Sequence, residues 1–317
     1  MKGLELARKY WEELGRPAFE KECPQVLERA CVGLAGEGSE CFGFDDEISR
    51  DHDWGPGFCV WLSKADADSF GEQARRIYAS LPEEFMGFKR LILNEQTGGR
   101  VGVLETGSFY ARYTGLDRLP QSIFEWRCMP ESGLAVVTNG ELFVKNEGLF
   151  PEIRSGLKEF YPEDLRKKKL AMHCAFAAQS GQYNYARCAH RGEMVAAFLA
   201  SAEFVGHVQA IVFLLNKQYR PYYKWTHRAM KDLPVLGAKL APKVEQIAGG
   251  AGADDGRPET PFHVKVDIIE EISSLIIDEL KAEGLSTSGS DFLLQHGEDI
   301  QRRIQDPQLR AMHLMAE

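Results

Sequence analysis

Two short groups of residues with chemically useful side chains lie close together in this sequence. Gly38-Ser39 is followed, after eleven residues, by Asp51-His52-Asp53. On a β-strand, residues 51 and 53 project to the same face, so both carboxylates can bind one cation. A Gly-Ser turn supplies backbone N–H groups, a hydroxyl and room for close approach of phosphate oxygens. The layout therefore predicts a metal-dependent site that transfers a nucleotidyl group.

This chemistry assigns a role to each residue of the two groups. An oxygen nucleophile attacks the α-phosphate of a nucleotide, and magnesium ions held by carboxylates neutralise the phosphates. Asp51 and Asp53 are the predicted catalytic metal ligands, and we expect two Mg²⁺ ions. Gly38 and Ser39 are expected to hold the β- and γ-phosphates. His52 should point to the opposite face of the strand, where a structural role is the simpler interpretation.

A third acid usually completes such a site, as metal ligand or general base. Glu105 is the first candidate, because it ends the apolar run Val101–Leu104, a predicted strand that could lie beside the Asp pair. Glu125, within Ile123-Phe124-Glu125-Trp126, is the alternative. The sequence leaves the choice between them open.

A second group of candidates for binding the nucleotide lies in the C-terminal half. In the segment Tyr219–Trp225, the ring of Tyr222 could stack on a base and Lys224 could meet a phosphate. The alternative is a helix end whose aromatics pack internally while Lys224 is solvated. Arg187 and Arg191, four residues apart, could share a helix face toward a ligand, or form a surface ion-pair face with Glu193.

Composition restricts the class of protein. The chain has 317 residues, 44% of them hydrophobic, and a formal net charge of −9. Without an extended Lys/Arg run, this acidity argues against nucleic acid as a partner. The seven cysteines form no Cys-x-x-Cys pair, which indicates free thiols in a reducing compartment. No apolar signal core follows Met1, and the run 211–215 is too short to span a bilayer, so we expect a cytoplasmic protein without membrane association.

The pattern of residues predicts an α+β fold with a mixed N-terminal part and an all-helical C-terminal part. We place the domains at residues 1–150 and 151–317. Helices are expected at 2–15, 24–31 and 64–81, the last capped by Ser63. Strands are expected at 32–35, 57–62, 90–94 and 101–105, and a hairpin at 134–144 around Asn139-Gly140. Residues 249–258 read as a flexible loop.

These motifs resemble the nucleotidyltransferase superfamily, with its polymerase-beta-like fold, which includes the aminoglycoside and minimal nucleotidyltransferases. In the superfamily motif, an apolar residue is followed by Gly and then by Gly or Ser. A spacer of about nine to thirteen residues separates this group from Asp-x-Asp or Asp-x-Glu. More closely, the chain is similar to a bacterial branch that carries a domain of unknown function. The stretches that carry this likeness are Gly38-Ser39-Glu40, Gly43-Phe44-Asp45-Asp46-Glu47, the segment Ser49 to Pro56, and Tyr219 to Trp225.

The resemblance implies a small mixed sheet flanked by helices, followed by a helical domain that covers a nucleotide cleft. It implies Mg²⁺ and a nucleoside triphosphate such as ATP, and it supplies no acceptor. We therefore expect transfer of a nucleoside monophosphate from ATP to a hydroxyl group of a small molecule or protein. Two alternatives stay open: a non-catalytic nucleotide sensor, and a toxin–antitoxin-like modifier of protein or tRNA. One departure from the motif is Glu37, which stands where the superfamily has an apolar residue.

Overall fold

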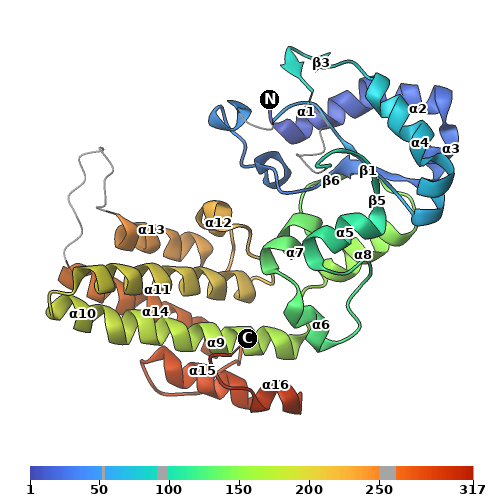
Figure 1. Ribbon diagram of the computed structural model, residues 1–317. Helices are drawn as coiled ribbons and strands as arrows, with labels where there is room; N and C mark the ends of the chain where they lie inside the picture. The colour runs from blue at the N-terminus through green and yellow to red at the C-terminus, as the bar shows by residue number, and fades with distance from the viewer. Residues whose placement is uncertain (52–53, 91–98, 250–261, 317) are drawn as a thin grey trace. The chain divides into compact units, whose positions relative to one another are not determined.

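The fold is α+β and consists of two compact units, Met1–Phe160 and Tyr161–Glu317. It was obtained as a computed structural model that describes residues 1–51, 54–90, 99–249 and 262–316. Figure 1 shows the helices and strands of both units. We call them the first and second unit and describe each by itself.

A four-stranded mixed sheet forms the centre of the first unit. Its strand order is β5-β2-β1-β6. β2 runs antiparallel to β1 and parallel to β5, and β6 runs antiparallel to β1. The short apolar runs predicted as strands form β1, β2 and β5. The bounds are Cys31–Leu34 for β1, Cys59–Leu62 for β2, Gly102–Glu105 for β5 and Glu141–Val144 for β6.

Four helices pack on one face of this sheet. Val60 and Leu62 of β2 point into a core that includes Tyr10, Phe19 and Ile77 from these helices. The predicted Ser63 cap is confirmed, since the Ser63 hydroxyl accepts a hydrogen bond from the backbone N–H of Asp66 at 3.1 Å. The helices are α1 (Gly3–Tyr10), α2 (Arg16–Glu22), α3 (Pro24–Arg29) and α4 (Lys64–Ser80), with a π-helical turn at Trp11–Gly15.

The opposite face of the sheet packs against an aromatic cluster on the helices that follow β5. Trp61 of β2 stacks on Phe150, with ring centroids 4.1 Å apart, and contacts Phe109 at 5.5 Å. These helices are α5 (Thr106–Thr114), α6 (Ile123–Cys128), α7 (Glu131–Thr138) and α8 (Leu149–Lys158). A two-stranded ribbon, β3 (Glu84–Phe85) and β4 (Phe88–Lys89), follows α4.

The hairpin predicted at residues 134–144 is wrong. Its second half is strand β6, but its first half lies in helix α7, which begins after Pro130. α7 packs so closely on α5 that a Cβ at Gly133 would overlap the carbonyl oxygen of Tyr113. This close packing holds residues 134–138 in a helix although Val136 and Val137 favour a strand. β6 pairs with β1 instead.

Every element of the second unit within the residues that the structure describes is helical, as the sequence predicted. α9 packs against both α11 and α15, and α13 packs against α14. A π-helical segment, Ala178–Tyr185, joins α9 to α10. The bounds are α9 Glu163–Ala177, α10 Ala186–His190, α11 Met194–Leu215, α12 Tyr223–Met230, α13 Gly237–Ala248, α14 Phe262–Ala282, α15 Leu293–Arg302 and α16 Pro307–Ala311.

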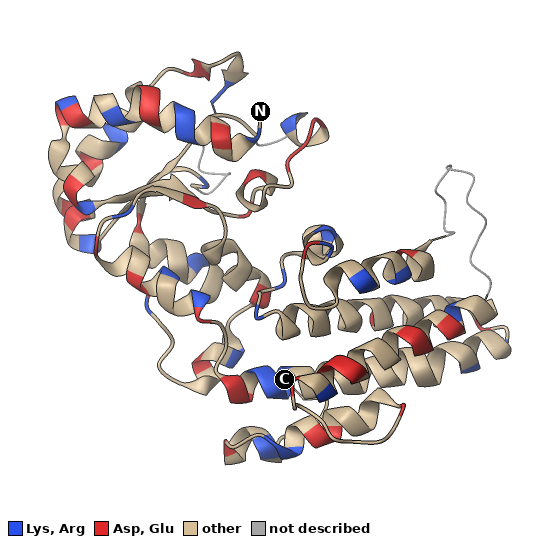
Figure 2. Cartoon of the chain, turned by 180° about the vertical axis from the view of Figure 1, so that it is seen from behind, with Lys and Arg blue, Asp and Glu red and all other residues tan. Residues whose placement is uncertain are grey.

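α11 is a longer apolar segment than the run 211–215 that the sequence indicated. Among the described helices it alone is long and apolar enough to cross a membrane by length and composition. More than half of its most apolar window is buried inside the protein, as in the core helix of a globular fold. Lys, Arg, Asp and Glu are interleaved over the outer helices of both units (Figure 2). Nearly all of the strand expected at 90–94 and of the loop expected at 249–258 lies outside the described residues.

Candidate functional site

The strand register brings three segments together at one end of the sheet. Gly33 of β1 pairs with Cys59 of β2, and Cys59 pairs with Gly102 of β5. Because β1 is antiparallel to β2, the chain leaves β1 where it enters β2 and β5. Residues 36–39, 54–58 and 99–101 therefore meet at this end, which we call the Gly-Ser end of the sheet.

The Gly-Ser turn has a fixed local shape. Gly38 caps a 3₁₀ helix, Ser39–Phe42, and its carbonyl oxygen accepts a hydrogen bond from the backbone N–H of Cys41 at 3.0 Å. A Cβ on Gly38 would overlap the carboxylate of Glu40 and the guanidinium of Arg100. Only glycine fits this position without displacing an ion pair. The hydroxyl of Ser39 is half-buried and makes no hydrogen bond to another described residue.

A buried ion pair lies directly against this turn. Nη2 of Arg100 contacts Oε1 of Glu40 at 3.2 Å, and Glu40 is only 6% exposed. The carbonyl oxygen of Arg100 accepts a hydrogen bond from the thiol of Cys59 at 3.3 Å, which ties Arg100 to β2. Arg100 was not among the predicted site residues, since a lone arginine after two glycines carries no motif. The structure thus places a cation beside Gly38, where a phosphate-binding turn was predicted.

Asn139 and Gly140 also hold the chain that leads to the Gly-Ser turn. The backbone N–H of Gly36 donates to Oδ1 of Asn139 at 3.1 Å, and Nδ2 of Asn139 donates to the carbonyl oxygen of Gly36 at 2.7 Å. The backbone N–H of Gly140 donates to the carbonyl oxygen of Cys41 at 2.9 Å. A pair of residues read as a hairpin turn therefore positions the turn that follows β1.

The prediction that Asp51 lies on a strand is wrong. Asp51 ends a 3₁₀ helix, Ile48–Asp51, and β2 begins only at Cys59. The side chain of Asp46 starts this helix by accepting a hydrogen bond from the backbone N–H of Ser49 at 3.1 Å, while the Ser49 hydroxyl accepts one from the N–H of Asp46. Asp51 therefore does not follow the side-chain alternation of a strand. His52 and Asp53 lie outside the described residues.

Trp54 returns the chain to the Gly-Ser end. The indole N–H of Trp54 donates to Asp45 at 3.2 Å, and the backbone N–H of Gly3 donates to the same oxygen at 2.7 Å. Asp45 is 3% exposed, and Nζ of Lys2 lies 3.7 Å from its other oxygen. A Cβ on Gly3 would overlap both Trp54 and Glu40, so these two side chains lie side by side. The residue after Asp53 thus lies next to the Gly-Ser turn.

Glu105, our first choice for a third acid, lies away from the Gly-Ser end of the sheet. It ends β5 beside Leu62, at the opposite end of the sheet from Gly38. Its carboxylate caps α5, accepting hydrogen bonds from the N–H of Gly107 at 2.7 Å and from the N–H and hydroxyl of Ser108, each at 2.6 Å. Partial burial raises the pKa of Glu105, but these bonds outweigh it and the pKa lies below its ordinary value.

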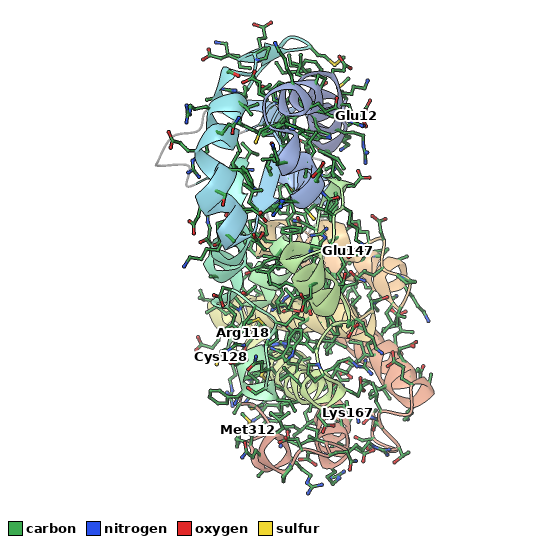
Figure 3. The ribbon with its side chains drawn as sticks, turned by 90° about the vertical axis from the view of Figure 1, so that its right-hand side faces the viewer. Glu12, Arg118, Cys128, Glu147, Lys167 and Met312 are labelled. Atoms are coloured by element: carbon green, nitrogen blue, oxygen red, sulfur yellow. The ribbon has the colours of Figure 1, made fainter. Side chains whose placement is uncertain are left out.

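Glu125, the alternative third acid, is also engaged by the protein. It lies on α6, and its two carboxylate oxygens accept hydrogen bonds from Arg118 at 2.8 and 3.0 Å. The Arg118 hydrogen bond and the N–H of Gln121 lower the pKa of Glu125 to about 2. Arg118, labelled in Figure 3, lies on the segment between α5 and α6.

The remaining candidates are surface residues of the second unit. Tyr222 precedes α12 and is exposed, with its ring 4.5 Å from that of Tyr223. Lys224 is exposed and lies over the ring of Trp225 at 4.9 Å. Arg187 of α10 is exposed and lies over the ring of Tyr183 at 4.7 Å. All three keep a charge or an aromatic face accessible to solvent.

Described acids in or beside the Gly-Ser end are already held by protein groups, and Glu37 lies 3.5 Å from Nη2 of Arg112. Glu40 is paired with Arg100 and Asp45 is bound by Gly3 and Trp54. The part of the chain that the structure describes contains no group of three side chains able to hold a metal ion. Asp51 and Asp53 carry the hard oxygen ligands that Mg²⁺ prefers, so their chemistry fits this ion.

Comparison with known proteins gives one match, to a domain within the chain. The search found no similar curated protein and no similar solved structure. Residues 126–226, from α6 through α12, match the family described as a domain of unknown function, DUF4037. The matched segment includes Asn139 and the exposed group around Tyr222, and it ends before α13.

Proposed function

We propose that this protein is a magnesium-dependent nucleotidyltransferase. It transfers a nucleoside monophosphate from a triphosphate, ATP in the first instance, to a hydroxyl group of an acceptor. Gly38 and Ser39 hold the β- and γ-phosphates in this proposal, and Asp51 and Asp53 bind Mg²⁺. The bound ions would neutralise phosphate charge and make the acceptor hydroxyl more acidic.

One observation supports this proposal above the others. Antiparallel pairing of β1 and β2 returns the chain to the Gly-Ser turn, and Trp54 lies against Glu40 there. Asp53 directly precedes Trp54 in the sequence, and we propose that it acts at this turn. The mixed order of β5, β2 and β1 is also compatible with the small mixed sheet that the resemblance implies.

Arg100 adds a role that the sequence did not suggest. Its guanidinium lies against Gly38, and the ion pair with Glu40 holds it there. A planar guanidinium binds phosphate oxygens in a bidentate manner, so Arg100 is our candidate for contacting the triphosphate. On the second unit, the ring of Tyr222 and the charges of Lys224 and Arg187 are exposed.

Calorimetric titration with ATP and MgCl₂ tests this function. We expect the wild type to bind, and Asp51→Asn and Asp53→Asn to lose at least about ten-fold in affinity, since each removes one anionic ligand. Asp68→Asn is the matched control, because Asp68 is exposed on α4 and makes no ion pair to a described residue. Equal binding by all four proteins would refute the site.

A non-catalytic nucleotide sensor is the second candidate, and one observation favours it. Both acids proposed to complete the site, Glu105 and Glu125, are bound by other groups of the protein. Pyrophosphate release separates the two functions. Wild-type protein with [α-³²P]ATP, Mg²⁺ and a cell extract should release pyrophosphate and label an acceptor if it is a transferase. Binding without release would indicate a sensor, and label in protein or RNA would identify the acceptor class.

A further inference from the structure

An apolar patch covers the outer face of α11 at its N-terminal end. Met194, Val195, Phe198 and Leu199 are each between 59% and 78% exposed, whereas their neighbours Ala197 and Ala200 are buried. The four large side chains occur at positions i, i+1, i+4 and i+5, which share one face of a helix. Soluble proteins rarely leave such a cluster uncovered unless another surface binds it.

The same face continues toward the middle of α11 with small residues. Ala202, exposed, follows Phe198 by four positions, and Gly206 follows Ala202 by four. Glu203 is the one Asp, Glu, Lys or Arg within Met194–Leu215. Large side chains at one end of a face and small ones at the other suit a helix that runs in the opposite direction.

The charges that border the patch have opposite signs at its two ends. Arg191 lies just before α11, is exposed and makes no ion pair with another described residue. Glu203 lies beyond the patch and is 54% exposed, and Nε2 of His207 lies 3.8 Å from its carboxylate. In a parallel pair of such helices, like charges would meet, and in an antiparallel pair, unlike charges meet.

We propose that this patch is a two-fold interface with a second copy of the same chain, in which α11 packs antiparallel to its counterpart. With the two-fold axis between Phe198 and Leu199, Phe198 faces Leu199 of the second copy. Val195 then faces Ala202, which matches a large side chain with a small one. Arg191 comes within about one helical turn of Glu203 of the second copy, and its long side chain can span this offset.

The interface is small, so the dimer dissociates on dilution. Four large side chains from each copy give a contact area at the lower end of specific interfaces. Sedimentation equilibrium of the full chain at about 1 to 100 µM should show a monomer–dimer equilibrium with a dissociation constant in this range. A monomer at every concentration would overturn the proposal.

Substitutions within the patch test its position. Phe198→Glu and Leu199→Glu should each raise the dissociation constant by at least about ten-fold, because each would bury an unpaired carboxylate. Phe124→Glu is the matched control, since Phe124 is 67% exposed on α6 of the first unit and lies outside the patch. Circular dichroism checks that the variants keep their helix content. A dimer that persists in Phe198→Glu would refute the proposed interface.

Charge reversal tests the antiparallel orientation. Glu203→Arg and Arg191→Glu should each weaken the dimer, because each brings like charges together, and the double variant should recover it. A double variant that dimerises as weakly as the single variants would reject this orientation.

Two other occupants of the patch would give distinct results, and each result overturns the proposal. If the protein stays monomeric and binds anionic lipid vesicles in a way that requires Phe198, the patch binds a membrane surface. If the thiol of a monomeric Leu199→Cys variant is protected from alkylation, the patch is covered by a segment of the same chain.

Discussion

The side chain of Asn139 makes two hydrogen bonds with the backbone of Gly36, which lies 103 residues earlier in the chain. One bond is donated by the Gly36 N–H and the other is accepted by its carbonyl oxygen. Asn139 therefore holds the segment between β1 and Gly38 in the way that a neighbouring strand would. The proposed phosphate-binding turn depends on a side chain from the loop between α7 and β6.

Asn139→Ala should lower both stability and nucleotide affinity. It removes two hydrogen bonds and leaves the Gly36 N–H and carbonyl groups without their partner, which costs about 1–3 kcal/mol. Urea unfolding monitored by circular dichroism measures the loss. Asn184→Ala is a suitable control, because Asn184 makes no side-chain hydrogen bond to a described residue. An unchanged unfolding midpoint for Asn139→Ala would contradict this role.

Arg100→Met should destabilise the fold by roughly 3 kcal/mol, because it removes the guanidinium that pairs with the buried carboxylate of Glu40. Adding Glu40→Gln should restore most of this stability by removing the charge. ATP affinity then separates two roles of Arg100. If Arg100 contacts phosphate, the double variant stays weak in ATP binding after its stability recovers. Full recovery of both properties would show that Arg100 acts only through Glu40.

Glu105→Gln should weaken the cap of α5 and leave ATP binding unchanged, since Glu105 lies at the opposite end of the sheet from Gly38. We expect a loss of about 1 kcal/mol at pH 7. The pKa of Glu105 is lowered in the folded protein, so its contribution is present above the ordinary glutamate pKa and is lost as the pH falls through the folded value. The stability difference between wild type and variant should therefore shrink below about pH 4. Loss of ATP binding in Glu105→Gln would instead restore it as a site residue.

The seven cysteines should differ strongly in their reaction with iodoacetamide. Burial raises the pKa of Cys59 and of Cys174 to about 12 and holds that of Cys41 well above its ordinary value. These thiols are protonated and inaccessible at pH 8. Cys128 is exposed at the end of α6 (Figure 3) and should react first. Peptide mass spectrometry after brief labelling measures this order, and early labelling of Cys59 would contradict the burial of β2.

Sequence alone determined the elements whose signals are local. The Ser63 cap marks the start of α4, and the strands predicted at residues 32–35 and 57–62 overlap β1 and β2. The all-helical character of the second unit also follows from the sequence, because helical periodicity is a property of neighbouring residues. The Gly-Ser turn was placed correctly at the end of a buried strand for the same reason.

Tertiary contacts decided what local signals could not. Residues 134–138 have a strand-like composition, yet they are helical because α7 packs against α5. Glu105 does end its predicted strand, but the parallel pairing of β5 with β2 places it away from Gly38. Strand order and direction depend on residues far apart in the chain, which no pattern of neighbours encodes. The meeting of Arg100, Asn139 and Trp54 at one end of the sheet has the same origin.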